Sequence, residues 1–247
     1  MIQISKRGIQ MPSSPIRKLA PFADAAKKEG VQVYHLNIGQ PDIETPKQCL
    51  DAVRHSDFKV LEYSHSAGNE SYRKKLVTYY AKNNIDVTHN DIIVTTGGSE
   101  AILFGFMACL DPEDEVIIPE PFYANYNGFA CQANVKVVPI GSKIETGFSL
   151  PPIEDFEKAI TPKTKAIVVC NPNNPTGTYI PATEMKRLRN GLPEHVILGI
   201  DDAYCEYADA ADYSDGSELV RGSENTVMLR TFSKIYGLSS LRLGWMF

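Results

Sequence analysis

Lys234 lies in the stretch TFSKIYGLSSLRLG, between hydroxyl side chains and a glycine turn, and Arg242 follows eight residues later. A lysine amine that is shielded from water is a competent nucleophile toward a carbonyl carbon. The planar fork of an arginine suits two-point binding of a phosphate. The pair therefore suggests a site for a phosphorylated carbonyl compound, although either residue alone could equally be a solvated surface charge.

Three other polar segments each follow a run of apolar residues. GGSEA after Thr96 is a glycine turn that can open a helix, whose free N–H groups could receive a phosphate. NPNNPTG after Cys170 has two Asn-Pro steps that stiffen the loop and could fix the direction of the Asn174 amide. DDAY after Ile200 places carboxylates at the end of a buried strand, where they need a cationic partner. Taken singly, ordinary turns and a structural ion pair explain these segments as well.

The hydrophobic pattern of the sequence predicts the strands and helices that carry these residues. Segments with helical spacing, such as SEAILFGFMACL and PPIEDFEKAI, lie between short apolar runs. Such alternation indicates an α/β fold, a mainly parallel seven-stranded sheet with helices on both faces. Ligands bind beyond the carboxyl ends of strands in such sheets, so the polar segments are expected to meet at one edge. The expected strands are residues 92–96, 116–118, 135–140, 166–170, 196–200, 227–230 and 243–247.

The first part of the chain has a different pattern. A helix is expected to start at Ser14 with Pro15 in its first turn, and VYHLNIGQPD is expected to cross in extended form as an arm. Thr45-Pro46 is expected to cap the next helix, and Asn69 the one after it. We therefore expect residues 1–45 to be an arm belonging to a small domain and residues 46–247 to form a large domain.

Composition narrows the class of protein. The chain has 247 residues and a formal net charge of -5, with basic residues scattered among acids, which disfavours a nucleic acid partner. Its five cysteines form no CxxC pair and suit a reducing cytoplasm. The N-terminus lacks the apolar segment of a signal peptide, and no stretch approaches the ~20 apolar residues of a membrane span. No residues are assigned as metal ligands.

Taken together, NIGQPD, TTGGSEA, NPNNPTG, DDAY and SKIYGLSSLRLG resemble the motifs of class I/II aminotransferases, pyridoxal-phosphate enzymes of fold type I. The resemblance runs from about Ser14 to the last residue and implies transfer of an amino group from an L-amino acid to a 2-oxo acid. The amino half is similar to aspartate or aromatic aminotransferases, whereas RTFSKIYGLSSLRLGW is similar to histidinol-phosphate aminotransferases. Another fold type I lyase or decarboxylase, or a non-catalytic pyridoxal-phosphate-binding sensor domain, stays an alternative because a fold does not fix a function.

The resemblance implies a role for each matching residue. Lys234 would form a Schiff base with the pyridoxal aldehyde and later move a proton at the substrate's alpha carbon. Asp201 would pair with the pyridine nitrogen, with Asp202 as the neighbouring alternative. Tyr204 and Asn174 would hydrogen-bond the 3-oxygen of the ring, and Asn174 would also face the substrate.

The resemblance assigns the ring face and the phosphate as well. Tyr123 in PEPFYANY would stack on the ring, where core packing would otherwise be the simpler explanation. The side chain of Glu100 must point away from the phosphate, because like charges repel. The phosphate would rest on the backbone N–H groups of Gly98, Ser99 and Glu100, with Thr231, Ser233 and Arg242 around it.

Two residues are assigned to the substrate and to a second subunit. Gly39 in NIGQPD resembles the glycine that lines the amino-acid site. Tyr63 in YSHSAG resembles the tyrosine that reaches the cofactor phosphate of a neighbouring subunit, which implies a homodimer.

Members of the family continue into a C-terminal small domain that supplies an arginine for the substrate carboxylate. The chain is therefore expected to be truncated, with that small domain absent. It is expected to bind the cofactor but to be impaired in transamination alone, since substrate orientation supplies much of the rate. Exposed apolar surface is expected on PIRKLAPFADAA.

Overall fold

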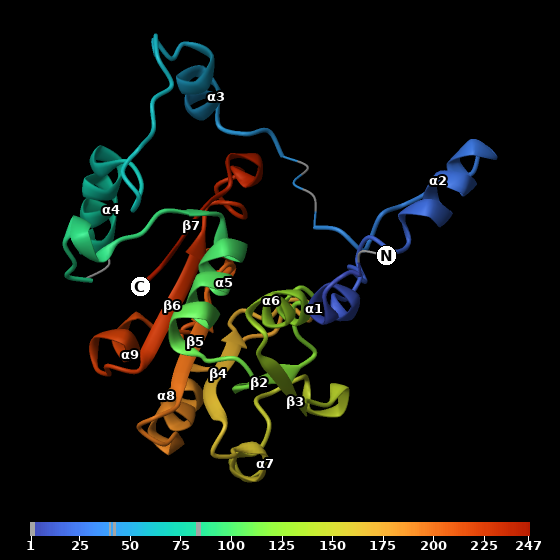
Figure 1. Ribbon diagram of the computed structural model, residues 1–247, viewed down its shortest axis with the longest axis vertical. Coiled ribbons are helices and arrows are strands. Elements are labelled where there is room, and N and C mark those ends of the chain that lie inside the picture. Colours follow the sequence, from blue (N-terminus) through green and yellow to red (C-terminus); the bar gives the residue numbers. More distant parts are fainter. Residues whose placement is uncertain (1–2, 40, 42, 83–84) are drawn as a thin grey trace.

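The computed structural model describes residues 3–39, 41, 43–82 and 85–247 and centres on one seven-stranded sheet (Figure 1). The spatial order of its strands is β1-β7-β6-β5-β4-β2-β3. β7 runs antiparallel to β1 and β6, and the other neighbours are parallel. The mainly parallel sheet is confirmed, and each expected run overlaps one strand: β1 (Thr95–Thr96), β2 (Glu115–Glu120), β3 (Lys136–Gly141), β4 (Thr164–Cys170), β5 (Ile197–Asp201), β6 (Thr226–Thr231) and β7 (Leu243–Met246).

The helices precede and connect these strands. None of the helices in the described part of the chain is long and apolar enough to cross a membrane. Short 3-10 turns lie at η1 (His89–Asp91), η2 (Ile144–Thr146), η3 (Cys205–Tyr207) and η4 (Ser239–Leu241). The α-helices are α1 (Lys6–Gln10), α2 (Ala20–Lys28), α3 (Lys47–Arg54), α4 (Glu70–Lys82), α5 (Gly98–Cys109), α6 (Tyr126–Ala133), α7 (Ile153–Ala159), α8 (Ala182–Gly191) and α9 (Ser217–Arg221).

Both faces of the sheet are covered. Along β2, Val116 and Ile118 pack beneath α5 and α6, whereas Ile117 points to the opposite face and packs with α7, α8 and α9. β4 repeats the pattern with Val168 on the first face and Val169 on the second. Because successive strand residues point to opposite faces, a strand covered on both sides reads as a continuous apolar run. Polar side chains are therefore concentrated where the strands end.

The helix expected at Ser14 starts later than predicted. The N–H groups of Arg17 and Lys18 donate to the Ser14 carbonyl at 3.1 Å and close a single turn, but α2 begins at Ala20. Pro21 explains the difference, because it lacks an N–H and its ring would clash with the carbonyl four residues earlier in a continuous helix. The earlier turn and α2 are consequently separate.

The two expected caps have different outcomes. Asn69 caps α4 as predicted, with its Oδ1 accepting from the Tyr72 N–H at 3.2 Å. Thr45 does not cap α3, because its hydroxyl donates instead to the carbonyl of Gly237 at 3.1 Å. That bond ties the segment before α3 to the turn that follows Lys234.

The N-terminal segments carry apolar side chains that the sheet does not cover. α1, α2 and α3 have no buried residue among those described, and α2 and α3 lie away from the sheet (Figure 1). Leu19 and Phe22 are exposed, as expected for PIRKLAPFADAA. Leu36 and Leu61, on either side of α3, are almost fully exposed.

A charged cluster is buried beside β6. Arg230 lies 3.8 Å from Asp202 and 3.9 Å from Glu206, and it also contacts Asp215 and the hydroxyl of Tyr79. Burial raises the pKa of Asp202 well above its ordinary value, and the nearby Arg230 opposes that shift. Neither carboxylate oxygen of Asp202 has a hydrogen-bond partner among the described residues. Asp202 therefore depends on the guanidinium charge.

Replacement of Arg230 by methionine tests this dependence. Arg230→Met is expected to lower the free energy of unfolding by about 3–5 kcal/mol, because a buried carboxylate loses its cation. Urea unfolding measures the change, and Arg230→Met combined with Asp202→Asn should recover much of it. Arg187→Ala, which breaks a surface pair with Glu184, is the control and should cost less than about 1 kcal/mol. An Arg230→Met chain as stable as the wild type would contradict the interpretation.

Candidate active site

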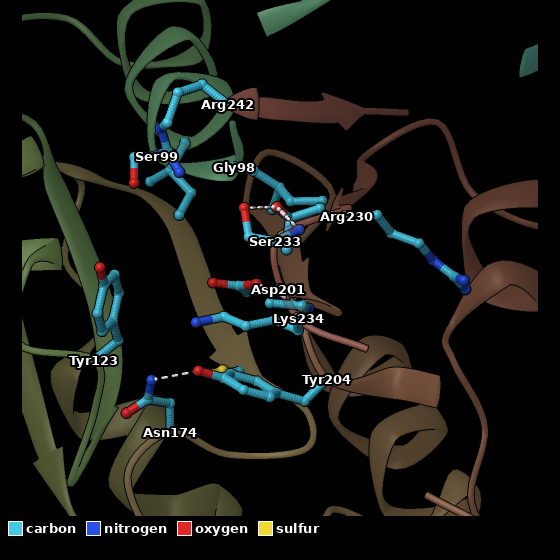
Figure 2. Close-up of a pocket in the computed structure, with 15 residues that line it drawn as sticks. Gly98, Ser99, Tyr123, Asn174, Asp201, Tyr204, Arg230, Ser233, Lys234 and Arg242 are labelled. Atoms are coloured by element: carbon cyan, nitrogen blue, oxygen red, sulfur yellow. Dashed lines mark hydrogen bonds between the residues drawn. The ribbon is translucent and has the colours of Figure 1, made fainter. Parts of the chain in front are cut away.

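The carboxyl ends of β4, β5 and β6 meet the start of α5 at a cavity of about 130 Å³. Figure 2 shows its side chains, with Arg242 and Ser99 toward one end and Asn174 and Tyr204 toward the other. Arg230 also lines the cavity, but through its backbone, because its side chain points away (Figure 2). Ten residues singled out from the sequence line it: Gly98, Ser99, Tyr123, Asn174, Asp201, Tyr204, Thr231, Ser233, Lys234 and Arg242.

Lys234 occupies the middle of the cavity. Its side chain extends between Asp201 and Tyr204, with the amine pointing into the cavity (Figure 2). The Nζ atom lies 4.9 Å from the centroid of the Tyr204 ring, within reach of a cation–π interaction. The turn that carries Lys234 is fixed to the end of β6, because the Ser233 N–H donates to the Thr231 hydroxyl at 3.1 Å. The amine thus lies where the two sets of cavity-lining side chains meet.

Asp201 is the acid of the cavity. Its Oδ2 accepts the hydroxyl of Tyr126 at 2.6 Å, and its Oδ1 accepts the N–H of Ala203 at 3.1 Å. Burial raises the pKa of Asp201, while these two hydrogen bonds and the charge of Lys234 act in the opposite direction. Asp202 points to the other face of the sheet, toward Arg230. Of the two acids, Asp201 lines the cavity and Asp202 does not.

Asn174 and Tyr204 form a polar pair at one end of the cavity. The Asn174 amide donates to the Tyr204 hydroxyl at 2.8 Å. Asn173 braces the loop that carries Asn174, since its Oδ1 accepts from the N–H of Thr176 at 3.0 Å and its amide donates to the carbonyl of Pro121 at 3.1 Å. The loop is therefore held by a side chain as well as by its prolines.

Glycines shape the other end of the cavity. A Cβ on Gly97, whose φ is +79°, would lie 2.6 Å from a guanidinium nitrogen of Arg242, and a Cβ on Gly244 would lie 2.3 Å from the nitrogen of Gly98. These contacts leave no room for a side chain where β7, the start of α5 and Arg242 meet. The first N–H groups of α5 lack intrahelical acceptors and carry the positive end of the helix dipole. With Arg242 beside them, they form a site for an anion such as phosphate.

Three expected residues lie outside this cavity: Glu100, Tyr63 and Gly39, of which Gly39 lines an adjoining cavity. The N–H of Glu100 donates to the carbonyl of Gly97 at 3.2 Å, so the helix already uses it. The Glu100 carboxylate folds back to accept the N–H of Thr96 at 2.6 Å. Tyr63 is fully exposed and lines neither this cavity nor the adjoining one. Its expected role concerns a second subunit.

A larger cavity of about 710 Å³ adjoins the first. Gly39 lines it together with Arg17 from the N-terminal arm. Two parts of the arm are joined to each other here, because the Asn37 amide donates to the Ile16 carbonyl at 2.6 Å. The two cavities share Tyr123, Asn174, Tyr204 and Lys234. A molecule in the larger cavity can therefore reach the Lys234 amine.

Sequence reasoning missed several residues of the site. Tyr126 stands three residues after Tyr123 in PFYANY, about one helical turn, a spacing that could have placed both side chains on the same side of the turn before α6. Its partner Asp201 lies 75 residues further along the chain, which local patterns do not connect. Gly244 was similarly missed, because its role depends on the approach of two backbone segments. Asn173 lies in the same loop as Asn174, and its bonds to Thr176 and Pro121 have no signal in the local sequence.

Comparisons with known proteins identify a family and several relatives that are similar to this chain. A family model described as aminotransferase class I and II matches residues 31–247. A histidinol-phosphate aminotransferase of Granulibacter bethesdensis is 42% identical over 236 residues, which cover 95% of this chain and 61% of that protein. A histidinol-phosphate aminotransferase of Nitrobacter winogradskyi is 35% identical over 240 residues, or 96% of this chain and 63% of that protein.

Solved structures show the same similarity in three dimensions. An aspartate aminotransferase from Thermus thermophilus with maleate superposes with a TM-score of 0.89 and 31% identity, and covers 100% of this chain and 64% of that one. An alanine aminotransferase from Pyrococcus furiosus gives a TM-score of 0.84 and 30% identity, with 99% and 63% covered. This chain spans less than two thirds of the length of each of these relatives.

The close approach of backbones at Gly244 predicts an intolerant position. Gly244→Ala is expected to cost about 1–3 kcal/mol or more of unfolding free energy, because the new methyl group meets main-chain atoms that cannot turn aside. Gly128→Ala in α6 is the matched control, since nothing lies within 4 Å of its Cβ position. That change should stabilise the chain by about 0.5–1 kcal/mol through helix propensity. Chemical unfolding of both variants measures the contrast, and equal effects would refute the explanation.

The buried carboxylate of Asp201 predicts a pH-dependent penalty. Because its pKa is raised on folding, stability falls as the pH rises from about 4 through the raised value, and the penalty is fully present above it. Asp201→Asn should therefore be more stable than the wild type at pH 7, and the difference should vanish near pH 4. Thermal unfolding across this range tests the sign. Asp57→Asn, at an exposed position, should show no such trend.

Proposed function

Because the chain belongs to the class I and II aminotransferase family, we propose that it binds pyridoxal phosphate and transfers an amino group from an amino acid to a 2-oxo acid. The observation that carries the proposal is the arrangement of Lys234 and Asp201 in one cavity with the anion site at the start of α5. An amine, an acid and an anion site around one cavity are the groups that the aldehyde, ring nitrogen and phosphate of that cofactor would require.

The residues present fit the cofactor. The glycine contacts at the start of α5 leave a cradle that a Cβ would fill, and Arg242 supplies a guanidinium beside it. Hydroxyl groups of Ser99, Thr231 and Ser233 line the same end of the cavity. A phosphate placed there would receive backbone N–H groups, hydroxyl groups and a cation together.

Each remaining group of the chain then has a chemical task. The Lys234 amine would hold the cofactor by condensing with its aldehyde carbon, with release of one water molecule. Asp201 would keep a proton on the ring nitrogen, because a carboxylate stabilises the charged form of a neighbouring base. Asn174 and Tyr204 would bind the phenolic oxygen, and Tyr123 would cover one face of the ring. When bound, the cofactor supplies a ring that accepts the electron pair left by a departing proton.

Substrate would enter through the larger cavity. Gly39 and Asn174 line it, and Lys234 reaches it, so that the freed amine can act as a base at the substrate's alpha carbon. The sequence relatives are histidinol-phosphate aminotransferases, which makes L-histidinol phosphate the first amino donor to test. Aspartate and alanine are the alternatives suggested by the structural relatives.

We further propose a homodimer in the cytoplasm. Tyr63 is fully exposed in its own chain, which suits contact with the phosphate site of a second copy. The exposed apolar side chains around α3 provide surface that such a copy would cover. All five cysteines are free, which suits a reducing compartment. We assign residues 1–45 to an arm of a small domain and residues 46–247 to the large cofactor-binding domain.

Cofactor attachment gives a direct test. Addition of pyridoxal phosphate to the purified chain should produce visible absorption, and borohydride should fix the cofactor to the peptide that contains Lys234. Lys234→Ala should abolish both signals, because no other amine is presented to the cavity in the described residues. Lys143→Ala, at an exposed position, is the control and should leave both unchanged. Labelling of other lysines with no loss in Lys234→Ala would refute the proposal.

A further inference from the structure

A tyrosine behind the cavity wall connects two of the proposed cofactor contacts. Tyr126 is the first residue of α6 and is completely buried in the core between α5, α6 and the sheet. Its ring packs edge-to-face on Tyr123 at 5.5 Å between centroids and 88° between planes, and lies 6.1 Å from the ring of Phe122. Packing of this kind fixes the ring position of Tyr126.

The hydroxyl of Tyr126 is directed at Asp201. The distance from this oxygen to Asp201 Oδ2 is 2.6 Å, short for a hydrogen bond and typical of a charged acceptor. A phenol buried in an apolar core needs a partner, because an unpaired hydroxyl there is costly. The bond therefore gives each of the two buried groups a hydrogen-bond partner, since Asp201 is also removed from water.

The second oxygen of Asp201 is also held. Oδ1 accepts the N–H of Ala203 at 3.1 Å, so each carboxylate oxygen has one donor from a different element. The charged and titratable groups facing Asp201 are Tyr126 on α6, Cys170 on β4, Lys234 after β6 and the adjacent Asp202. Among the interactions that oppose the burial penalty on Asp201, the Tyr126 hydrogen bond ranks first. The plane of the carboxylate is thus set by its two donors.

We propose that Tyr126 is a positioning residue that holds the Asp201 carboxylate and the Tyr123 ring in a fixed mutual arrangement. One contact of Tyr126 is the hydrogen bond to the acid, and the other is the edge-to-face contact with the aromatic wall opposite Lys234 (Figure 2). A flat, nitrogen-containing ring between them would meet the acid at its edge and Tyr123 at its face. This inference rests on the proposed function, which supplies pyridoxal phosphate as that ring.

Removal of one oxygen atom tests the role. Tyr126→Phe keeps the aromatic packing and deletes the hydrogen bond to Asp201. The affinity of the chain for pyridoxal phosphate, measured by fluorescence titration, is expected to fall about tenfold to a hundredfold, as for loss of a hydrogen bond to a charged group. Tyr213→Phe is the matched control. It also removes a hydroxyl hydrogen bond, to the Asn171 carbonyl at 3.1 Å, but at a position that does not line the cavity, so the affinity should change little.

Two further readouts separate positioning from general damage. In the Asp201→Asn background, Tyr126→Phe should cause little additional loss, because coupled residues are non-additive. With 1-deazapyridoxal phosphate, which lacks the ring nitrogen, Tyr126→Phe and the wild type should bind alike. An equal loss of affinity in both backgrounds and with both cofactors would overturn the inference.

A measurement on the wild type covers the case in which Tyr126→Phe does not fold. The proton of a short hydrogen bond to a carboxylate should give a downfield resonance that Asp201→Asn removes and that shifts when pyridoxal phosphate is added. A resonance unmoved by the cofactor would overturn the inference. If the wild type binds no pyridoxal phosphate, the proposed function and this inference fail together. If cofactor binding depends on Lys234 but not on Tyr126, only this inference fails.

Discussion

Burial of the Asp201 carboxylate is the constraint around which the site is arranged. A carboxylate removed from water is costly unless donors and a nearby cation compensate it. Here the donors come from α6 and from the turn after β5, and the cation is Lys234 from the end of β6. Each of these elements must be in place for the charge to be tolerated. Asp201 is therefore in contact both with α6, through Tyr126, and with the charge of the Lys234 amine.

The alternation of side chains along β5 and its following residue gives the two faces of the sheet different electrostatic roles. Asp201 faces the cavity, and Asp202 faces Arg230 on the opposite side. Arg230 itself belongs to β6, whose next residue, Thr231, returns to the cavity. A buried ion cluster that fixes β5 against β6 thereby lies directly behind the residues that line the site. Its contribution is to hold the strand ends in register, because a displaced β6 would move Lys234 as well.

The anion site at the start of α5 depends on the close approach of two backbone segments as well as on the charge of Arg242. Gly244 on β7 touches the Gly97–Gly98 turn, and this contact sets where the N–H groups of α5 point. Arg242 precedes β7 directly, so the same strand brings its guanidinium to the turn. The N-terminal arm is different, since many of its apolar side chains are exposed, and the Asn37 amide joins two parts of it by its bond to the Ile16 carbonyl. The arm and the site residues meet in the larger cavity.

The hydrophobic pattern alone predicted the seven strands and the helices on both faces, because continuous apolar runs are local signals. The ten cavity residues were predicted from the polar segments after those runs together with the resemblance to a known family. The sequence placed Asp201 and Lys234 at strand ends, where a parallel sheet brings distant segments to one edge. It did not determine the start of α2, the bond of Thr45 to Gly237, or the absence of Glu100 from the cavity. Those features depend on tertiary packing, as do the position of Asp201 but not Asp202 at the cavity and the link from Tyr126 to Asp201. The reason is physical: side-chain direction and hydrogen-bond partners depend on how segments far apart in the chain pack, and no local pattern of residues encodes that packing.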